Sequence, residues 1–168
     1  TEDKMYMTKR EMEEEIVSLL GGRVAESIVF GDISTGASND IERATKMARG
    51  MVTKYGMSEL LGPIVYGTGH EEVFLGRDYG SAKNYSEKVA ADIDAEIKDI
   101  ITEAYSKCEN IIRTHQDKLT VVAEYLIENE KADRETFEAL MNGTYIKPDA
   151  ETPEALETSE ETKTVTEE

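Results

Sequence analysis

The sequence is poor in residues that cross-link or stiffen a chain, with one cysteine, three prolines and no tryptophan among its 168 residues. The single thiol, Cys108, excludes an internal disulfide framework. It falls on an apolar helical stripe, so we expect it to be buried and to pack as a small hydrophobic side chain. No apolar run approaches the roughly 20 residues that span a membrane, and no signal peptide opens the sequence. The segment by itself is therefore expected to be soluble, and it is long enough for one compact domain with a core.

Basic residues are also scarce, with 19 lysines and arginines against 36 acidic residues and a formal net charge of −17. Residues 147–168 hold eight of the acids and two lysines, so the preceding residues still carry a net charge of −11. Phosphate backbones are bound by basic surfaces, and anionic lipids attract polybasic segments. The charge therefore argues against a nucleic-acid partner and against a lipid-binding surface on this segment.

Histidine occurs only twice, which limits the metal chemistry that the segment can support. His70 begins the run His-Glu-Glu-Val-Phe, where a His-Glu-x-x-His zinc motif would need a second histidine at position 74 and a helix. His115 lies at an expected helix junction, and we expect both histidines at the surface. The glycine-rich stretch 56–81 contains no Gly-Lys-Ser or Gly-Lys-Thr, so ATP is not expected to bind here. The segment alone is predicted to lack the three protein ligands that a catalytic zinc requires.

Apolar residues recur at helical spacing along most of the chain, which predicts an all-α fold, a bundle of about five helices. Thr8 and Glu11 form a capping-box pattern that opens the first helix, and Gly31 ends it. Gly21 and Gly22 interrupt this helix, either as a close-packing point or as a break between two shorter helices. The helices expected after the first cover residues 39–54, 86–113, 119–127 and 133–143.

Two stretches are expected to depart from the helical pattern. Short apolar runs at 64–66 and 73–75 predict a small hairpin or an irregular cover over the core. From Lys147 onward threonine and glutamate dominate with almost no apolar residues, which predicts an acidic, disordered tail. We therefore expect a helical domain over residues 1–146 and a tail over residues 147–168.

A loop rich in glycine, serine and aspartate, residues 31–38, precedes the second helix. Ser38 or Asn39 is placed to cap that helix, and with Asn39 as the cap Glu42 completes an asparagine version of the capping box. Asp40 is in register with the apolar stripe, so its carboxylate is predicted to leave the first turn on the inward side and to need a partner. It is either an acid held near a helix N-terminus by the helix dipole or a ligand of a metal ion whose other ligands come from elsewhere.

Several motifs in a fixed order carry a resemblance to a known family. They are Leu-Gly-Gly-Arg-Val-Ala-Glu at 20–26, Ser-Thr-Gly-Ala-Ser-Asn-Asp at 34–40, Tyr-Gly-Met-Ser at 55–58, Leu-Gly-Pro at 61–63 and Asn-Tyr-Ser at 84–86. From about Met5 to about Gly143 the sequence resembles the protease domain of FtsH, a family of membrane-anchored, ATP-dependent zinc metalloproteases. The resemblance implies the helical fold of that domain.

The resemblance also implies roles for two carboxylates. In the family, the aspartate at the Asp40 position completes a zinc site that begins with two histidines of an upstream His-Glu-x-x-His helix, which this sequence does not include. The upstream glutamate would take a proton from the zinc-bound water, so no catalytic residue is expected in this segment. Glu26 is a candidate for orienting the ligands, because its segment lies close to the zinc in the family. Its pairing with Arg23 is equally typical of a surface ion pair.

For the intact protein, the resemblance implies a homohexamer that degrades unfolded or misassembled proteins, with ATP bound by a separate upstream ATPase domain. It would be anchored in the bacterial inner membrane by an N-terminal part, with this domain in the cytoplasm. The segment would supply the third zinc ligand and a helical assembly scaffold, and would be inactive alone. The alternative from another class is a non-catalytic helical assembly or adaptor module, in which Asp40 is only a helix cap.

Overall fold

The computed structural model describes residues 6–67 and 85–147. Six α-helices and one 3₁₀ turn lie within these ranges. The elements in chain order are α1 (Lys9–Leu19), α2 (Gly21–Phe30), η1 (Thr35–Ala37), α3 (Ser38–Thr53), α4 (Glu87–Thr114), α5 (Gln116–Asn129) and α6 (Arg134–Asn142). No strand occurs in the described ranges, so the all-α prediction is confirmed. Of the expected hairpin, residues 64–66 are irregular, whereas 73–75 lie outside the described residues, as does the tail beyond Lys147.

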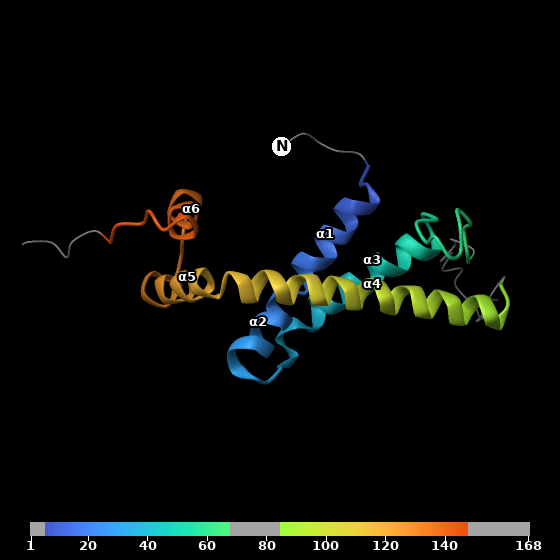
Figure 1. Ribbon diagram of the computed structural model, residues 1–168, viewed down its shortest axis with the longest axis horizontal. Helices are drawn as coiled ribbons and strands as arrows, with labels where there is room; N and C mark the ends of the chain where they lie inside the picture. The colour runs from blue at the N-terminus through green and yellow to red at the C-terminus, as the bar shows by residue number, and fades with distance from the viewer. Residues whose placement is uncertain (1–5, 68–84, 148–168) are drawn as a thin grey trace, which may run out of the picture. The chain divides into compact units, whose positions relative to one another are not determined.

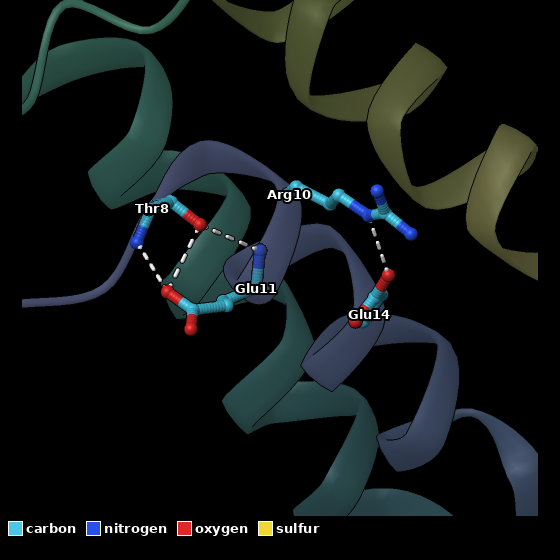
Figure 2. Close-up of polar contacts among 4 residues, drawn as sticks. All are labelled: Thr8, Arg10, Glu11 and Glu14. Atoms are coloured by element: carbon cyan, nitrogen blue, oxygen red, sulfur yellow. Dashed lines mark hydrogen bonds and ion pairs between the residues drawn. The ribbon is translucent and has the colours of Figure 1, made fainter. Parts of the chain in front are cut away.

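The first helix begins where the sequence predicts. Figure 2 shows the capping box, in which the Thr8 N–H donates to Glu11 Oε2 at 2.8 Å and the Glu11 N–H donates to Thr8 Oγ1 at 3.3 Å. In the same part of the helix, Arg10 Nε donates to Glu14 Oε1 at 2.9 Å. Together these contacts satisfy N–H groups that have no partner within the first helical turn and add an ion pair of the favourable i,i+4 spacing.

The glycine pair breaks the first predicted helix in two. Helix α1 ends at Leu19 and α2 begins at Gly21. A Cβ built on Gly21 or Gly22 would meet no atom within 4 Å, so within the described residues neither glycine is a close-packing point. Of the two alternatives that the sequence leaves open, the break is the one found.

The first of two compact units, Thr1–Leu119, is built on α4. Helices α1, α2 and α3 all pack against it, and in Figure 1 they run from blue to cyan beside the yellow-green α4. The largest side chains buried almost completely in this unit are Ile16, Val24, Met51, Val52 and Ile93. Cys108 belongs to the same apolar cluster, as predicted, and burial raises the pKa of its thiol.

The segment after α3 is tied to the core by one buried hydroxyl. Ser58 donates through Oγ to Glu96 Oε2 of α4 at 2.5 Å, and the Leu61 N–H donates back to Ser58 Oγ at 3.0 Å. Gly56 makes the turn that precedes it, with φ +60°. A Cβ there would lie 2.8 Å from the Cα of Pro63, so both the backbone angle and the close approach require glycine.

The second unit, Thr120–Glu168, contains most of α5 together with α6. Asp133 caps α6 by accepting from the Thr136 N–H at 2.8 Å, and Gly143 ends it with φ +69°, in agreement with the helix expected over residues 133–143. Beyond α6 the chain is fastened to α5, because Lys147 Nζ lies 2.8 Å from Glu128 Oε2. Among the described helices of both units, none is long and apolar enough to cross a lipid bilayer.

Shortening Ile93 to alanine should lower the free energy of unfolding by about 2–5 kcal/mol, because the side chain is 1% exposed and its removal leaves a cavity. Ile111→Ala on the same helix is the matched control. Ile111 is 45% exposed, so its loss should cost about 1 kcal/mol or less. Urea unfolding of both variants measures the difference, and equal losses would contradict the assignment of the core to one face of α4.

Gly56→Ala should destabilise the chain by about 1–2 kcal/mol from the backbone angle alone, with the contact at Pro63 adding to that loss. Gly22→Ala should instead be neutral or stabilise the chain by up to about 1 kcal/mol, because it lies in a helix and the new methyl group meets nothing. Thermal and urea unfolding would test the pair. A large loss of stability in Gly22→Ala would show that this glycine is a packing point after all.

Candidate metal centre

The loop between α2 and α3 follows directly from its residue types. Gly31 ends α2 with φ +65°, a left-handed angle that glycine adopts without strain. The Asp32 carboxylate then accepts from the Ile33 N–H at 2.8 Å. Ser34 next opens the 3₁₀ turn η1, accepting through Oγ from the Gly36 N–H at 3.1 Å. The loop is therefore held by short polar side chains and leads straight into α3.

Glu26 on α2 reaches across to this loop. Its Oε1 accepts from the Ser34 hydroxyl at 2.6 Å, and its Oε2 accepts from the Ser34 N–H at 3.2 Å. The predicted pair with Arg23 is present, with Nη1 3.9 Å from Glu26 Oε2. That distance is too long for a hydrogen bond, and Arg23 Nη1 is buried without one in the described residues. The main partner of Glu26 is thus Ser34 rather than Arg23.

These contacts change the acidity of Glu26. The pKa of its carboxyl group is lowered from 4.5, first by the Ser34 hydroxyl and then by the Ser34 N–H, because both donate to the ionised form. Arg23 lowers it further, whereas desolvation and the nearby Asp32 charge raise it. Glu26 is therefore held as a carboxylate whose two oxygens are both occupied by one residue.

The start of α3 differs from the prediction. Ser38 and Asn39, the predicted caps, both lie inside the helix, whose cap position is Ala37, and no side chain caps it. The reason is that η1 runs directly into α3, with the Ser38 N–H donating to the Thr35 carbonyl, so helical backbone begins before a side-chain cap is needed. The asparagine capping box with Glu42 is accordingly wrong, and Glu42 pairs with Lys46 instead, at 2.7 Å.

Asp40 lies at the third residue of α3, and the structure leaves it partly exposed there. Its side chain is 46% exposed. Ala37, one turn before it, and Ala44, one turn after it, are both buried, and its neighbour Ile41 packs partly buried against the core. Its partner is Arg43, whose Nη1 is 3.5 Å from Asp40 Oδ1 and whose Nη2 is 3.9 Å from Glu15 Oε1 on α1. Both pairs are long and half exposed, so each contributes little.

The donor set decides what the described residues could hold. No group of three histidine, cysteine, aspartate or glutamate side chains in those residues is arranged to bind a metal. His115 is exposed at the end of α4, as predicted, and His70 lies outside the described residues. Asp40 presents an accessible carboxylate, which is a normal zinc ligand. Among the described residues, Asp40 therefore offers one accessible carboxylate, and no set of three metal ligands is present.

Sequence reasoning missed two contacts. Ser34 follows Glu26 by eight residues, a separation that matches no helical period, so only the Ser-x-Gly turn pattern could have drawn attention to it. Arg43 is half exposed, and it lies between two carboxylates from different helices. An i,i+3 acid–base pair is visible in the sequence, whereas the contact with α1 is not.

Comparison with known proteins assigns the chain to a family. The profile of Peptidase family M41 matches residues 1–140, which include α1, the candidate loop and α4. The chain belongs to peptidase family M41. The ATP-dependent zinc metalloprotease FtsH 1 of Thermoanaerobacter sp. is 63% identical over 146 residues, covering 87% of this chain and 24% of that protein. FtsH of Bacillus subtilis is 48% identical over 142 residues, covering 84% and 22%.

The resemblance to the FtsH family is thereby confirmed. The chain spans about a quarter of the length of these M41 relatives, whose names describe ATP-dependent zinc metalloproteases. Both Glu26 and Asp40 fall inside the matched region.

The lowered pKa of Glu26 gives the loop a defined pH dependence. A carboxyl group whose pKa is lowered by folding contributes stability that is present in full above pH 4.5 and is lost as the pH falls through its lowered pKa. The free energy of unfolding of the wild type should therefore exceed that of Glu26→Gln by more at pH 7 than at pH 3. Urea unfolding at a series of pH values measures this difference, and a difference independent of pH would contradict the contact with Ser34.

Proposed function

We propose that this chain supplies Asp40 as one zinc ligand of the peptidase centre of a longer, ATP-dependent metalloprotease. The observation that carries the proposal is an accessible carboxylate on the first turn of α3, within the region that matches family M41. Its present partner, Arg43, is half exposed and 3.5 Å away. An exposed pair of this kind is worth about 1 kcal/mol or less, so a metal ion could replace it at little cost.

The remaining ligands would come from residues outside these 168. A catalytic zinc takes three protein ligands and keeps one position open, and the described residues offer one. We expect two histidines of a His-Glu-x-x-His helix to complete the set, as the resemblance implies. When bound, the ion would polarise a substrate carbonyl and lower the pKa of a bound water.

Within this chain, the residues around Asp40 would hold and orient it. The position of Asp40 in the first turn of α3 places its negative charge at the positive end of the helix dipole. The ion pair between Arg43 of α3 and Glu15 of α1 joins that turn to a neighbouring helix. Glu26 would act as an orienting residue, because its two oxygens hold Ser34 at the start of the turn that leads to Asp40.

For the whole protein we propose the activity named for its M41 relatives, acting on unfolded or misassembled protein substrates. ATP would bind to a separate domain, and the helical faces of this segment would contact neighbouring subunits of a homohexamer. An anchor outside this segment would hold the protein in the bacterial inner membrane with this domain in the cytoplasm. The identity and coverage of the relatives support this proposal, and the net charge of −17 is consistent with a protein rather than a nucleic-acid partner.

The zinc content of the full-length protein tests the ligand assignment. The wild type should carry about one zinc per chain, and Asp40→Asn should lose most of it, because an amide is a far weaker zinc ligand than a carboxylate. Asp94→Asn is the matched control, since Asp94 is an exposed aspartate on α4 with a single distant arginine contact. Atomic absorption after dialysis measures the metal directly, without reference to activity.

Other results of the zinc measurement would favour other assignments. Equal zinc in the wild type and in Asp40→Asn would make Asp40 a helix-terminal acid only, with Glu26 the next ligand to test. An absence of zinc from both would favour the non-catalytic helical assembly or adaptor module. The 168-residue chain alone should bind no stoichiometric zinc and cleave no casein, and one zinc per chain there would overturn the proposal that further ligands are needed.

A further inference from the structure

We propose that Ser34 is a positioning residue for the Asp40 carboxylate, acting through Glu26 and the 3₁₀ turn η1. This inference rests on the proposed function, because it concerns how the Asp40 ligand is aimed. It also gives Glu26 a definite role, since its carboxylate orients the ligand by fixing the turn that leads into α3.

The first step is the contact between α2 and the loop. Ser34 presents its hydroxyl and its own N–H to the two oxygens of Glu26, at 2.6 and 3.2 Å. A two-point contact of this kind fixes both the position and the rotation of Ser34 relative to α2, and bonds to a charged acceptor are the stronger kind. Residue 34 is thereby attached to a helix whose Val24 is fully buried in the core.

The second step is the set of hydrogen bonds that links Ser34 to α3. Ser34 Oγ also accepts from the Gly36 N–H at 3.1 Å, which caps η1. The turn then passes into α3 through the bond from the Ser38 N–H to the Thr35 carbonyl. Ala37, between them, is buried at 7% exposure. Asp40 therefore follows the fixed Ser34 along one continuous helical path, through η1 and the start of α3.

The third step is that α3 has no cap of its own. Helices α1, α4 and α6 are each capped by a side chain that accepts a hydrogen bond from a backbone N–H of the first turn. The capping residues are Thr8, Ser86 and Asp133 respectively. Helix α3 begins at Ser38, and the residue at its cap position, Ala37, provides no such side chain. An uncapped helix start frays more readily, so the geometry of the turn that carries Asp40 depends on η1 and on the serine that caps η1.

The close packing of the turn supports the same assignment. A Cβ built on Gly36 would lie 3.2 Å from Ser34 Oγ and 3.7 Å from Glu26 Oε1. The turn thus lies directly against the Glu26–Ser34 contact. Metal sites tolerate only small errors in ligand position, and loss of a group that orients a ligand typically lowers metal affinity about 10–100-fold.

The test compares zinc affinity in the full-length protein, measured by competition with a chromophoric chelator. Ser34→Ala should weaken zinc binding about 10-fold or more, and Ser34→Thr, which keeps the hydroxyl, should restore most of it. Because Glu26 and Ser34 act through one contact, Glu26→Gln combined with Ser34→Ala should lose no more affinity than the worse single variant. Asp40→Asn is measured alongside.

Ser86→Ala is the matched control for general destabilisation. Ser86 also caps a helix by accepting a backbone N–H, from Val89 at 3.3 Å, but it does so at the start of α4. Ser86→Ala should lower the urea midpoint, as Ser34→Ala does, but should leave the zinc affinity unchanged.

The outcomes separate the inference from the proposed function. Loss of zinc in Asp40→Asn with unchanged affinity in Ser34→Ala would overturn the positioning role alone. Additive losses in the double variant, or equal zinc losses in Ser86→Ala and Ser34→Ala, would do the same. Undiminished zinc in Asp40→Asn would overturn the ligand assignment, and the positioning role with it.

Discussion

The packing of three helices against one face of α4 is the constraint on which the rest of the described structure depends. Val24, Met51 and Ile93 are almost fully withdrawn from water, and they come from α2, α3 and α4 respectively. Apolar burial is the main favourable term in folding, so these contacts determine where α2 and α3 lie. The polar loop between those two helices can then be short and specific, because its two ends are already held in place by the core.

Much of this arrangement could be predicted from local sequence patterns. The caps at Thr8, Ser86 and Asp133 and the stop at Gly143 were predictable because each depends on atoms within four residues. The apolar stripe of α4 was visible for the same reason, since the helical period records which face is buried. The glycine pair at 21–22 left two outcomes open, because choosing between them requires knowing what surrounds each glycine.

The candidate site was less predictable, since its contacts join residues from different elements. Asp40 could be singled out from the sequence, but the helical period does not say how far its carboxylate is buried, and the side chain is 46% exposed. Ser38 and Asn39 are good caps by residue type, yet the preceding turn made them unnecessary. The bond from Ser34 to Glu26 has no periodic signature, and the family resemblance alone does not specify it. Local rules therefore fail where one element determines the start of another.

The contact between Glu26 and Ser34 also closes the intervening residues into a small ring. The ring comprises the last turn of α2 and the loop residues 31–33, and its two ends are held regardless of the path between them. Closing a slightly longer loop costs little free energy, because the entropy of closure grows only with the logarithm of loop length. Among natural variants of this chain, insertions and deletions should therefore gather after Gly31, whereas the spacing from Ser34 to Asp40 should stay constant. The ring isolates the turn that carries Asp40 from changes in the length of its own connection.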